Sequence, residues 1–346
     1  MKKGLFSFVG TILVTMCLLG FTASLPPPAS AGPITLSYAN FPPAPTFPCV
    51  QMERWKKEVE SRTGGKVKVN TYPGGTLLGA KNMMDGVIAG QADIGCLCMA
   101  YQPGRFIVTN ATALPVGFPN ATVASLTLLD LYEKYKPKEF ADVKVLTMFT
   151  CAPANIYAKK AVQSLEDLKG LKLRASGGVL QVLKTLGATP VGMPQSETPE
   201  DLQKGVVVGA VSSLETLMDF KYAELCRHVT IMNGPIYPFA VVMNQAKWNS
   251  LPKDVQKVMD DLSREQSEWT GKYMDGHVEK SIAWSKKNYN IEIYELPQKE
   301  ADRWNEMLEP ITDKWIKDAE AKGIPSKKVL KYIKKMNKKY SKKYGG

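Results

Sequence analysis

The fold is decided by the stretch Leu171-Lys-Leu-Arg-Ala-Ser-Gly177, which has the pattern of a buried strand that ends in a turn. Its apolar residues alternate with polar ones, and Gly177 and Gly178 turn the chain into a helix that follows. Arg174 therefore stands at the carboxyl end of a strand, where open α/β sheets place their ligands. Its rigid guanidinium matches a carboxylate with two parallel hydrogen bonds. A salt bridge on the surface is the alternative role for this arginine.

Strand and helix patterns alternate on both sides of this stretch. The segments before it predict strands at 34–38, 66–70 and 92–95, with helices at 50–63 and around Met83. The segments after it predict a helix from Val179, a strand at 188–191, a helix from Thr198 and a strand at 206–212. Alternation at these spacings is typical of parallel βαβ units, so we expect an α/β protein.

Two further apolar segments, 143–149 and 236–243, are expected to pass between the two groups of βαβ units. Two such crossings make a hinge, which suits a protein that closes on a ligand. Residues 253–288 contain no proline and predict a very long helix, for which we expect a break at Gly271 or Gly276.

The N-terminus has the pattern of a secretory signal peptide. Lys2 and Lys3 precede an apolar run over 5–19, and Ala29-Ser-Ala31 offers a cleavage site. A membrane anchor is the alternative, but glycines and prolines interrupt the apolar run and it is short for a bilayer. We therefore assign residues 1–31 to a signal peptide cleaved near Ala31, and we expect an exported, periplasmic protein.

The formal net charge is +12, and removal of Lys2 and Lys3 lowers it to +10. A basic chain can bind nucleic acid, an anionic membrane or anionic small molecules, and export makes nucleic acid the least favoured partner. Nine lysines lie between Lys327 and Lys343, in a segment with apolar residues at helical spacing. We expect a C-terminal helix packed on the second half of the protein with a solvated lysine face. A cationic helix lying on a membrane is the alternative.

Five cysteines follow the predicted signal peptide, namely Cys49, Cys96, Cys98, Cys151 and Cys226. The Cys96-Leu-Cys98 spacing is not that of common zinc hairpins, and the chain has only two histidines. We predict cysteines packed as small apolar residues, and neither a metal site nor a cofactor.

Motifs of the common hydrolases are not found in this sequence. It contains no HExxH, no GxSxG and no P-loop. We therefore predict a binding protein with no catalytic residues. Two alternatives stay open: a periplasmic hydrolase or lyase that acts on an organic acid, and a membrane-surface docking protein that uses the lysine-rich tail.

Four motifs together carry a resemblance to a known family: Leu165-Glu-Asp-Leu-Lys-Gly-Leu-Lys-Leu-Arg174; Gly187-Ala-Thr-Pro190 with Met193-Pro194; Leu202-Gln-Lys-Gly-Val-Val207; and Gly90-Gln-Ala-Asp-Ile-Gly95. In this order the chain resembles the DctP-type solute-binding proteins of tripartite ATP-independent periplasmic (TRAP) transporters. The resemblance implies a two-lobed periplasmic solute-binding fold. Each lobe would hold a mostly parallel sheet flanked by helices, with a ligand cleft between the lobes and a long helix spanning both. We expect residues 32–153 and 241–282 to form the first lobe, and residues 154–240 and 283–346 to form the second.

The same resemblance implies that Arg174 holds the carboxylate of an organic acid. It places the rest of the cleft on loops and strand ends of both lobes. The ligand-binding candidates beside Arg174 are Phe47, Tyr101, Gln102, Met193, Gln195, Ser212, Ser213, Tyr237 and Phe239. In such a protein the membrane partners would be the permease subunits of the transporter.

Departures from the family pattern narrow the ligand that the sequence predicts. Many relatives carry a second cationic or polar group at the segment that here reads Cys151-Ala-Pro-Ala-Asn155. Where many carry Asp-Gly and then Glu-Asn, this chain has Val208-Gly209 and Ser212-Ser213. Polar ligand groups left unpaired in a buried cleft are costly. We therefore expect a monocarboxylate with an apolar or aromatic body, and neither a dicarboxylate nor sialic acid.

Overall fold

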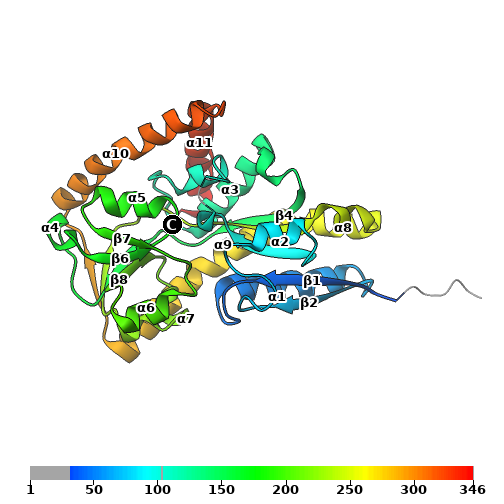
Figure 1. The fold of residues 1–346 in the computed structure, drawn as a ribbon, viewed down its shortest axis with the longest axis horizontal. Helices are drawn as coiled ribbons and strands as arrows, with labels where there is room; N and C mark the ends of the chain where they lie inside the picture. The colour runs from blue at the N-terminus through cyan, green and yellow to red at the C-terminus, as the bar shows by residue number, and fades with distance from the viewer. Residues whose placement is uncertain (1–31, 103, 346) are drawn as a thin grey trace, which may run out of the picture. The chain divides into compact units, whose positions relative to one another are not determined.

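The computed structural model describes residues 32–102 and 104–345. The predicted signal peptide, residues 1–31, lies outside the described residues. Residues 33 onward form one compact unit that contains two mixed β-sheets (Figure 1). We call each sheet with the helices packed on it a lobe.

The first lobe is built on a five-stranded sheet. Its strand order is β2 (Val67–Tyr72), β1 (Ile34–Asn40), β3 (Ile94–Cys98), β10 (Pro238–Asn244) and β4 (Val143–Thr150). β10 alone runs antiparallel to its neighbours. Helices α1 (Phe47–Arg62) and α3 (Ala121–Tyr135) pack along this sheet, and α2 (Met83–Ile88) packs on β3 and β10.

The second lobe is built on a six-stranded sheet. Its strand order is β11 (Glu292–Glu295), β9 (His228–Ile231), β5 (Asn155–Ala158), β8 (Gly209–Ser212), β6 (Lys172–Ala175) and β7 (Thr189–Gly192). β5 alone runs antiparallel to its neighbours. The expected α/β fold with mostly parallel sheets is confirmed in both lobes. The strand expected at 206–212 starts later, at Gly209, and Val206 is 44% exposed in the preceding turn.

The remaining helices are α4 (Leu165–Leu168), α5 (Gly178–Thr185), α6 (Thr198–Lys204), α7 (Thr216–Asp219), α8 (Gln245–Ser250), α9 (Lys253–Tyr289), α10 (Gln298–Glu320) and α11 (Ser326–Tyr344). Short 3₁₀ turns occur at η1 (Met99–Tyr101), η2 (Thr109–Ala113), η3 (Lys138–Phe140) and η4 (Tyr222–Glu224). None of the helices in the described part of the chain combines the length and the apolar character needed to cross a bilayer.

Two short segments carry the chain between the lobes, and each adjoins a segment that we expected to cross: 143–149 and 236–243 themselves lie almost wholly in β4 and β10 of the first sheet. Residues 151–154 lead from β4 to β5, and residues 232–237 lead back from β9 to β10. The backbone N–H of Cys151 donates to the carbonyl of Tyr237, and the N–H of Gly234 donates to the carbonyl of Ala154. The two crossings therefore lie side by side and form a paired connection between the sheets.

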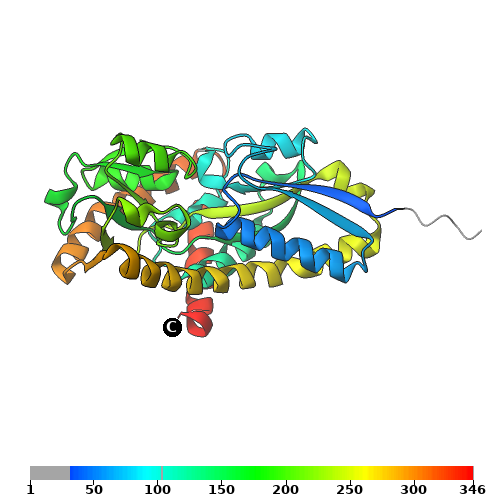
Figure 2. The same cartoon turned by 90° about the horizontal axis from the view of Figure 1, so that it is seen from below.

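Helix α9 is a third connection, and it is continuous over its 37 residues (Figure 2). It packs on α1, α3 and β4 of the first lobe and on α7 of the second. The expected break at Gly271 or Gly276 is wrong. A Cβ at Gly271 would lie 2.5 Å from the Cα of Thr122, so this glycine lets α9 approach α3 closely. Around Gly276 there is nothing within 4 Å of such a Cβ.

The lysine-rich helix α11 packs on α3 of the first lobe. Its buried face consists of Val329, Leu330, Ile333, Met336 and Tyr340. We expected residues 283–346 to lie in the second lobe, and β11 does pair with β9 there. For α11 that expectation is wrong, because its apolar residues complete a cluster with those of α3.

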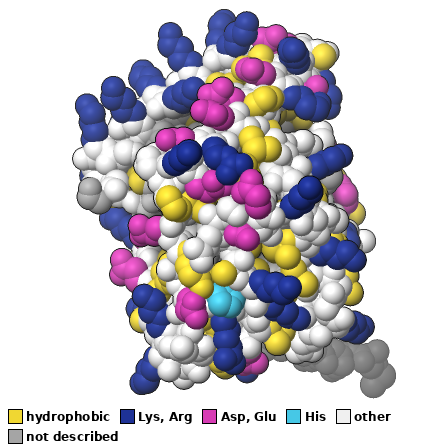
Figure 3. Space-filling model, turned by 90° about the vertical axis from the view of Figure 1, so that its left-hand side faces the viewer, with side chains coloured by type: hydrophobic (Ala, Val, Ile, Leu, Met, Phe, Trp, Pro, Cys, Tyr) yellow, Lys and Arg dark blue, Asp and Glu magenta, His cyan; other side chains and the backbone are white. Residues whose placement is uncertain are grey.

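The surface charge is mixed where Figure 3 displays it. Basic and acidic side chains are mixed over the middle of this face, with hydrophobic side chains scattered among them, while a row of basic side chains follows its upper left margin (Figure 3). On this face, therefore, the positive excess of the sequence does not form an unbroken basic surface.

Candidate ligand-binding site

A cavity lies where strand ends of the two lobes meet. The loop after β1 and the turn η1 after β3 supply its wall in the first lobe. The residues after β6 and β8 supply its wall in the second lobe, and the crossing segments contribute Cys151 and Tyr237. Carboxyl ends of parallel strands are the usual ligand sites of α/β sheets, so the topology places this cavity where chemistry is expected.

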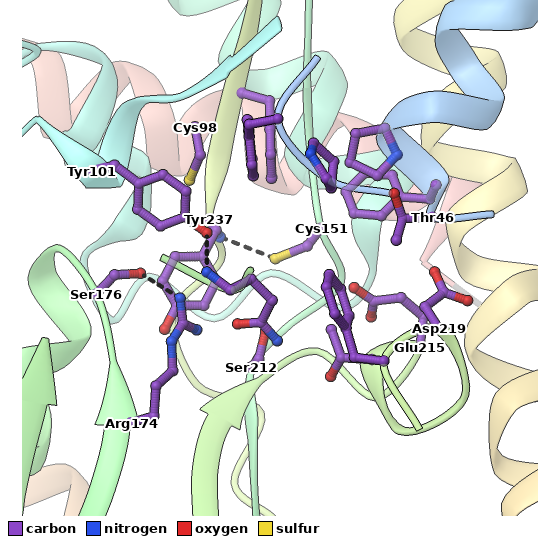
Figure 4. Close-up of a pocket in the computed structure, with 18 residues that line it drawn as sticks. Thr46, Cys98, Tyr101, Cys151, Arg174, Ser176, Ser212, Glu215, Asp219 and Tyr237 are labelled. Carbon is purple, nitrogen blue, oxygen red and sulfur yellow. Dashed lines mark hydrogen bonds between the residues drawn. The ribbon is translucent and has the colours of Figure 1, made fainter. Parts of the chain in front are cut away.

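The cavity is narrow, with a volume of about 40 Å³. The lining residues are Phe41, Pro42, Thr46, Phe47, Pro48, Cys98, Tyr101, Cys151, Arg174, Ser176, Gln195, Ser212, Glu215, Thr216, Asp219, Phe220, Tyr237 and Phe239 (Figure 4). An occupant must be small, or the lobes must separate to admit it.

Aromatic side chains form the wall on the side of the first lobe. Phe239 stacks on Phe149 with ring centroids 5.2 Å apart and on Phe41 at 6.4 Å. Phe47 meets Phe239 edge-on at 5.5 Å, and Tyr101 meets Phe41 edge-on at 5.5 Å. Rings held in this way offer a rigid apolar surface to an alkyl or aromatic body.

Arg174 is buried at the cavity with only 1% of its surface exposed. Its Nε and Nη2 donate to the carbonyl of Met193 at 3.0 and 2.8 Å, and Nη2 lies 3.5 Å from the Ser176 hydroxyl. These partners fix the guanidinium in place, but neither of them carries a negative charge. A buried cation without an anion is costly, because burial removes its hydration. The site is therefore suited to an anion.

The turn after β6 brings this arginine against the other lobe. Gly177 has a φ of +55°, which favours glycine. A Cβ there would also lie 2.8 Å from the Cβ of Ala100 in η1. The glycine that marked the turn in the sequence thus also permits a close approach between the lobes.

Tyrosine hydroxyls surround the guanidinium. Burial raises the pKa of Tyr101 to about 12 and raises the pKa of Tyr237 as well, against the opposing effect of Arg174. Both phenols therefore stay neutral at physiological pH. The Tyr101 oxygen accepts from the backbone N–H of Gln195 at 3.1 Å, and the Tyr237 hydroxyl donates to the carbonyl of Val211 at 2.9 Å. Neither tyrosine supplies the missing negative charge.

Two carboxyl groups line the cavity beyond these tyrosines. Glu215 is 2% exposed and accepts a hydrogen bond from the Ser213 hydroxyl, and burial raises the pKa of its carboxyl to about 8. Asp219 accepts from Nε2 of His277 at 2.7 Å, and this hydrogen bond raises the pKa of His277. Glu215 is thus largely protonated at pH 7, while Asp219 is hydrogen-bonded to His277.

The sequence-predicted residues fall into two groups. Those that line the cavity with Arg174 are Phe47, Tyr101, Gln195, Ser212, Tyr237 and Phe239. The others that we predicted stand outside that lining set: Met193, Ser213 and Gln102. Met193 gives its carbonyl to Arg174, and Ser213 binds Glu215. Gln102 points elsewhere, because its amide binds the carbonyl of Lys81 and the side chain of Arg105.

Sequence reasoning missed Glu215, Asp219, Thr216 and Phe220 as cavity residues. They follow β8 within a short helix, and a carboxylate just after a strand is usually solvated. The available signal was their position at the carboxyl end of a parallel strand next to that of Arg174.

All five cysteines in the described part of the chain are buried free thiols. Burial raises the pKa of Cys49, Cys98 and Cys226 to about 12, so these three stay protonated and unreactive at pH 7. The structure agrees with the prediction that they pack as small apolar residues.

Comparison with known proteins now gives this architecture a family. The model of the DctP family, bacterial extracellular solute-binding protein family 7, matches residues 42–318. The chain belongs to this family. Solved structures similar to this chain include a TRAP periplasmic solute-binding protein from Desulfovibrio salexigens, 55% identical with a TM-score of 0.81. That match covers 90% of this chain and 97% of the Desulfovibrio protein, whose ligand-binding site holds the C-terminus of a symmetry mate.

A second similar structure is that of a TRAP solute-binding protein from a marine metagenome that is specific for aromatic acid ligands. It is 30% identical to this chain with a TM-score of 0.85, and the match covers 89% of this chain and 99% of the metagenomic protein. Its structure holds metahydroxyphenylacetate. The C4-dicarboxylate-binding periplasmic protein DctP of Rhodobacter capsulatus is 25% identical over 319 residues, which are 90% of this chain and 96% of the relative. The recognition of a TRAP solute-binding protein and of its two-lobed fold is thereby confirmed.

Proposed function

We propose that this chain is the periplasmic binding component of a TRAP transporter and that it captures a monocarboxylate with an apolar or aromatic body. The observation that carries the proposal is Arg174, a buried cation without an anionic hydrogen-bond partner among the described residues, at the edge of an aromatic-walled cavity. A ligand carboxylate would complete this site with charge-assisted hydrogen bonds.

The relatives support an organic acid. The metagenomic relative binds an aromatic acid, and the Desulfovibrio relative accommodates a chain terminus, which ends in a carboxylate. The Rhodobacter relative binds C4-dicarboxylates. For this chain we favour a single carboxylate, because Glu215 and Asp219 would face a second one within the same cavity.

The hinge and the narrow cavity support a binder that opens and closes. Two paired crossing segments and one continuous helix join the lobes. Separation of the lobes would admit the ligand, and closure would bury it. The closed form would then deliver the ligand to the membrane permease subunits, and the ligand would leave chemically unchanged. We place the protein in the periplasm after cleavage of the signal peptide near Ala31.

The test is titration calorimetry of benzoate and phenylacetate against the exported protein and two variants. Arg174→Ala should weaken both acids about a hundredfold or more, since it leaves a buried anion unpaired. Arg174→Lys keeps the charge but loses the planar fork of the guanidinium. Its affinities for the two acids should therefore lie between those of the wild type and those of Arg174→Ala. The control Arg303→Ala breaks an exposed ion pair with Glu166 and should change nothing. Equal affinities for wild type and Arg174→Ala would refute the proposal.

A second measurement identifies the natural ligand. Mass spectrometry of the purified protein, denatured to release what it retained, should find an organic acid with one carboxylate. The same acid should be recovered intact after long incubation with the protein, because a binder does not convert it. Recovery of a dicarboxylate as the retained ligand would contradict the proposed ligand class.

A further inference from the structure

The cavity has two chemically different ends. Arg174 enters it from β6, while Glu215 and Asp219 enter it from the segment that follows β8. Figure 4 shows Arg174 on one side of the cavity and both carboxyl groups on the other, next to Thr46 of the first lobe. An acid bound to Arg174 through its carboxylate would therefore extend its other end toward Glu215 and Asp219.

Asp219 presents an unused hydrogen-bond acceptor at that end. Its side chain is only 4% exposed, and its Oδ1 is engaged by His277 on α9. Its Oδ2 is buried and has no hydrogen-bond partner. A buried carboxylate oxygen without a donor has lost its hydrogen bonds to water and has gained none within the protein, which costs free energy. A hydrogen-bond donor on the ligand would give Oδ2 of Asp219 the partner that it lacks.

Gln195 is a second and independent sign of a polar occupant. It lines the same cavity and is 7% exposed, yet neither its Oε1 nor its Nε2 has a partner. The hydroxyl of Tyr157 forms a hydrogen bond of 2.9 Å with the hydroxyl of Thr216. Buried amides are normally paired, so a free amide at a cavity wall indicates a group that arrives with the ligand.

The charges distinguish among three possible groups at the far end of the ligand. A second carboxylate would meet Asp219 and Glu215, which offer it repulsion or at best one shared proton. An ammonium would find Oδ1 of Asp219 already engaged by His277 and a Glu215 that burial keeps largely protonated, so neither carboxyl is fully available to balance its charge. A hydroxyl brings a donor and no charge, and it leaves Arg174 balanced by the single carboxylate of the ligand.

We propose that Asp219 and Glu215 are specificity-determining residues that receive a hydroxyl group carried by the ligand at the end opposite its carboxylate. Asp219 accepts a hydrogen bond from the hydroxyl through Oδ2, and Glu215 and Gln195 complete the polar surroundings of the hydroxyl oxygen. The ligand class is thus a hydroxylated monocarboxylic acid. This inference rests on the proposed function, because Arg174 must hold the carboxylate for the far end to reach Asp219.

The experiment compares benzoate with its 2-, 3- and 4-hydroxy isomers by titration calorimetry. At least one isomer should bind the wild type about tenfold more tightly than benzoate, since a hydrogen bond to a charged group is worth that much. In Asp219→Asn and in Glu215→Gln this preference, measured against benzoate in the same variant, should shrink to about threefold or less. The control Asp261→Asn removes an exposed carboxylate paired with Lys257 and should retain the preference.

A second measurement needs no variant. Isophthalate and terephthalate place a second carboxylate at the far end and should bind the wild type at least about tenfold more weakly than benzoate. Equal binding of benzoate and all hydroxy isomers, or a preference that survives in Asp219→Asn, would overturn the inference. Tighter binding of 3-(aminomethyl)benzoate than of any hydroxy isomer would also overturn it, in favour of an ammonium. If the hydroxyl makes no difference but Arg174→Ala still abolishes binding, the inference fails and the proposed function stands.

Discussion

The phenol oxygen of Tyr101 accepts a hydrogen bond from the backbone N–H of Gln195 at 3.1 Å, and this bond joins the two lobes across the cavity. Tyr101 belongs to the turn after β3 of the first sheet, and Gln195 follows β7 of the second. Both residues line the cavity. The bond can exist only while the lobes are close together, so it favours the closed form over an open one.

Replacement of Tyr101 by phenylalanine should therefore weaken ligand binding by about threefold to tenfold, because one neutral hydrogen bond is lost from the closed state alone. Titration calorimetry with benzoate measures the effect, and stopped-flow fluorescence should assign it mainly to faster release. Tyr132→Phe on α3 serves as the control and should leave affinity unchanged. An unchanged affinity for Tyr101→Phe would mean that the bond does not contribute to closure.

Gly271 and Gly276 provide a matched pair on the same helix. Gly271→Ala would place its Cβ 2.5 Å from the backbone of α3, and the two helices would have to separate. We expect a loss of about 1–3 kcal/mol in the free energy of unfolding, as for other overpacked contacts. Gly276→Ala meets nothing within 4 Å and should stabilise α9 by about 0.5–1 kcal/mol. Urea denaturation of both variants checks the prediction, and equal effects would contradict it.

This pair also shows what the sequence could not reveal about α9. A glycine within a helical pattern predicts a weak point, because glycine lowers helix propensity. The contact that explains Gly271 lies about 150 residues away in the chain, at Thr122. Local patterns carry no information on such a contact. For the same reason, the spacing of Val329 and Ile333 predicted an apolar helix face but did not indicate that this face packs on α3.

Only part of the candidate site could be predicted, because some of its residues have local sequence signals and others depend on distant packing. Arg174 and Gly177 mark a strand end and its turn, and these are local signals that the structure bears out. Glu215 and Asp219 gave no comparable signal. Their burial depends on packing against α9, whose His277 lies 58 residues beyond Asp219. Acidic residues after a short strand look solvated until that helix is placed over them.

The apolar face of α11 should be necessary for stability. Ile333 is fully buried against α3, so Ile333→Ala should lower the free energy of unfolding by about 2–4 kcal/mol through lost burial and a cavity. Lys334→Ala changes the adjacent exposed position and should have an effect within about 0.5 kcal/mol. Thermal and urea unfolding of both variants test this. A small effect of Ile333→Ala would mean that α11 is detached from α3 in solution.

Glu215 should make the stability of the ligand-free protein depend on pH. Its carboxyl has an ordinary pKa of 4.5, which burial raises to about 8 in the folded chain. Between these values the folded chain keeps a proton that the unfolded chain has released. Stability is therefore lost as pH rises through this window, by up to about 1.4 kcal/mol per pH unit for one proton. The raised pKa of His277 adds a contribution of the same sign above pH 6.5, and its largest cause, the hydrogen bond to Asp219, is kept when Glu215 is replaced.

Glu215→Gln isolates the carboxyl, because glutamine keeps the shape of the side chain and cannot ionise. We expect the variant to lose less stability than the wild type between pH 5 and 8, with a difference that grows to a few kcal/mol at the upper end. Urea unfolding at intervals of half a pH unit measures it. The control Glu306→Gln, at an exposed position of α10, should follow the wild-type curve. Parallel curves for Glu215→Gln and the wild type would show that Glu215 is already ionised at pH 5 in the folded protein. The hydroxyl of the proposed ligand would then meet two carboxylates, and an ammonium would become the better match for that end of the cavity.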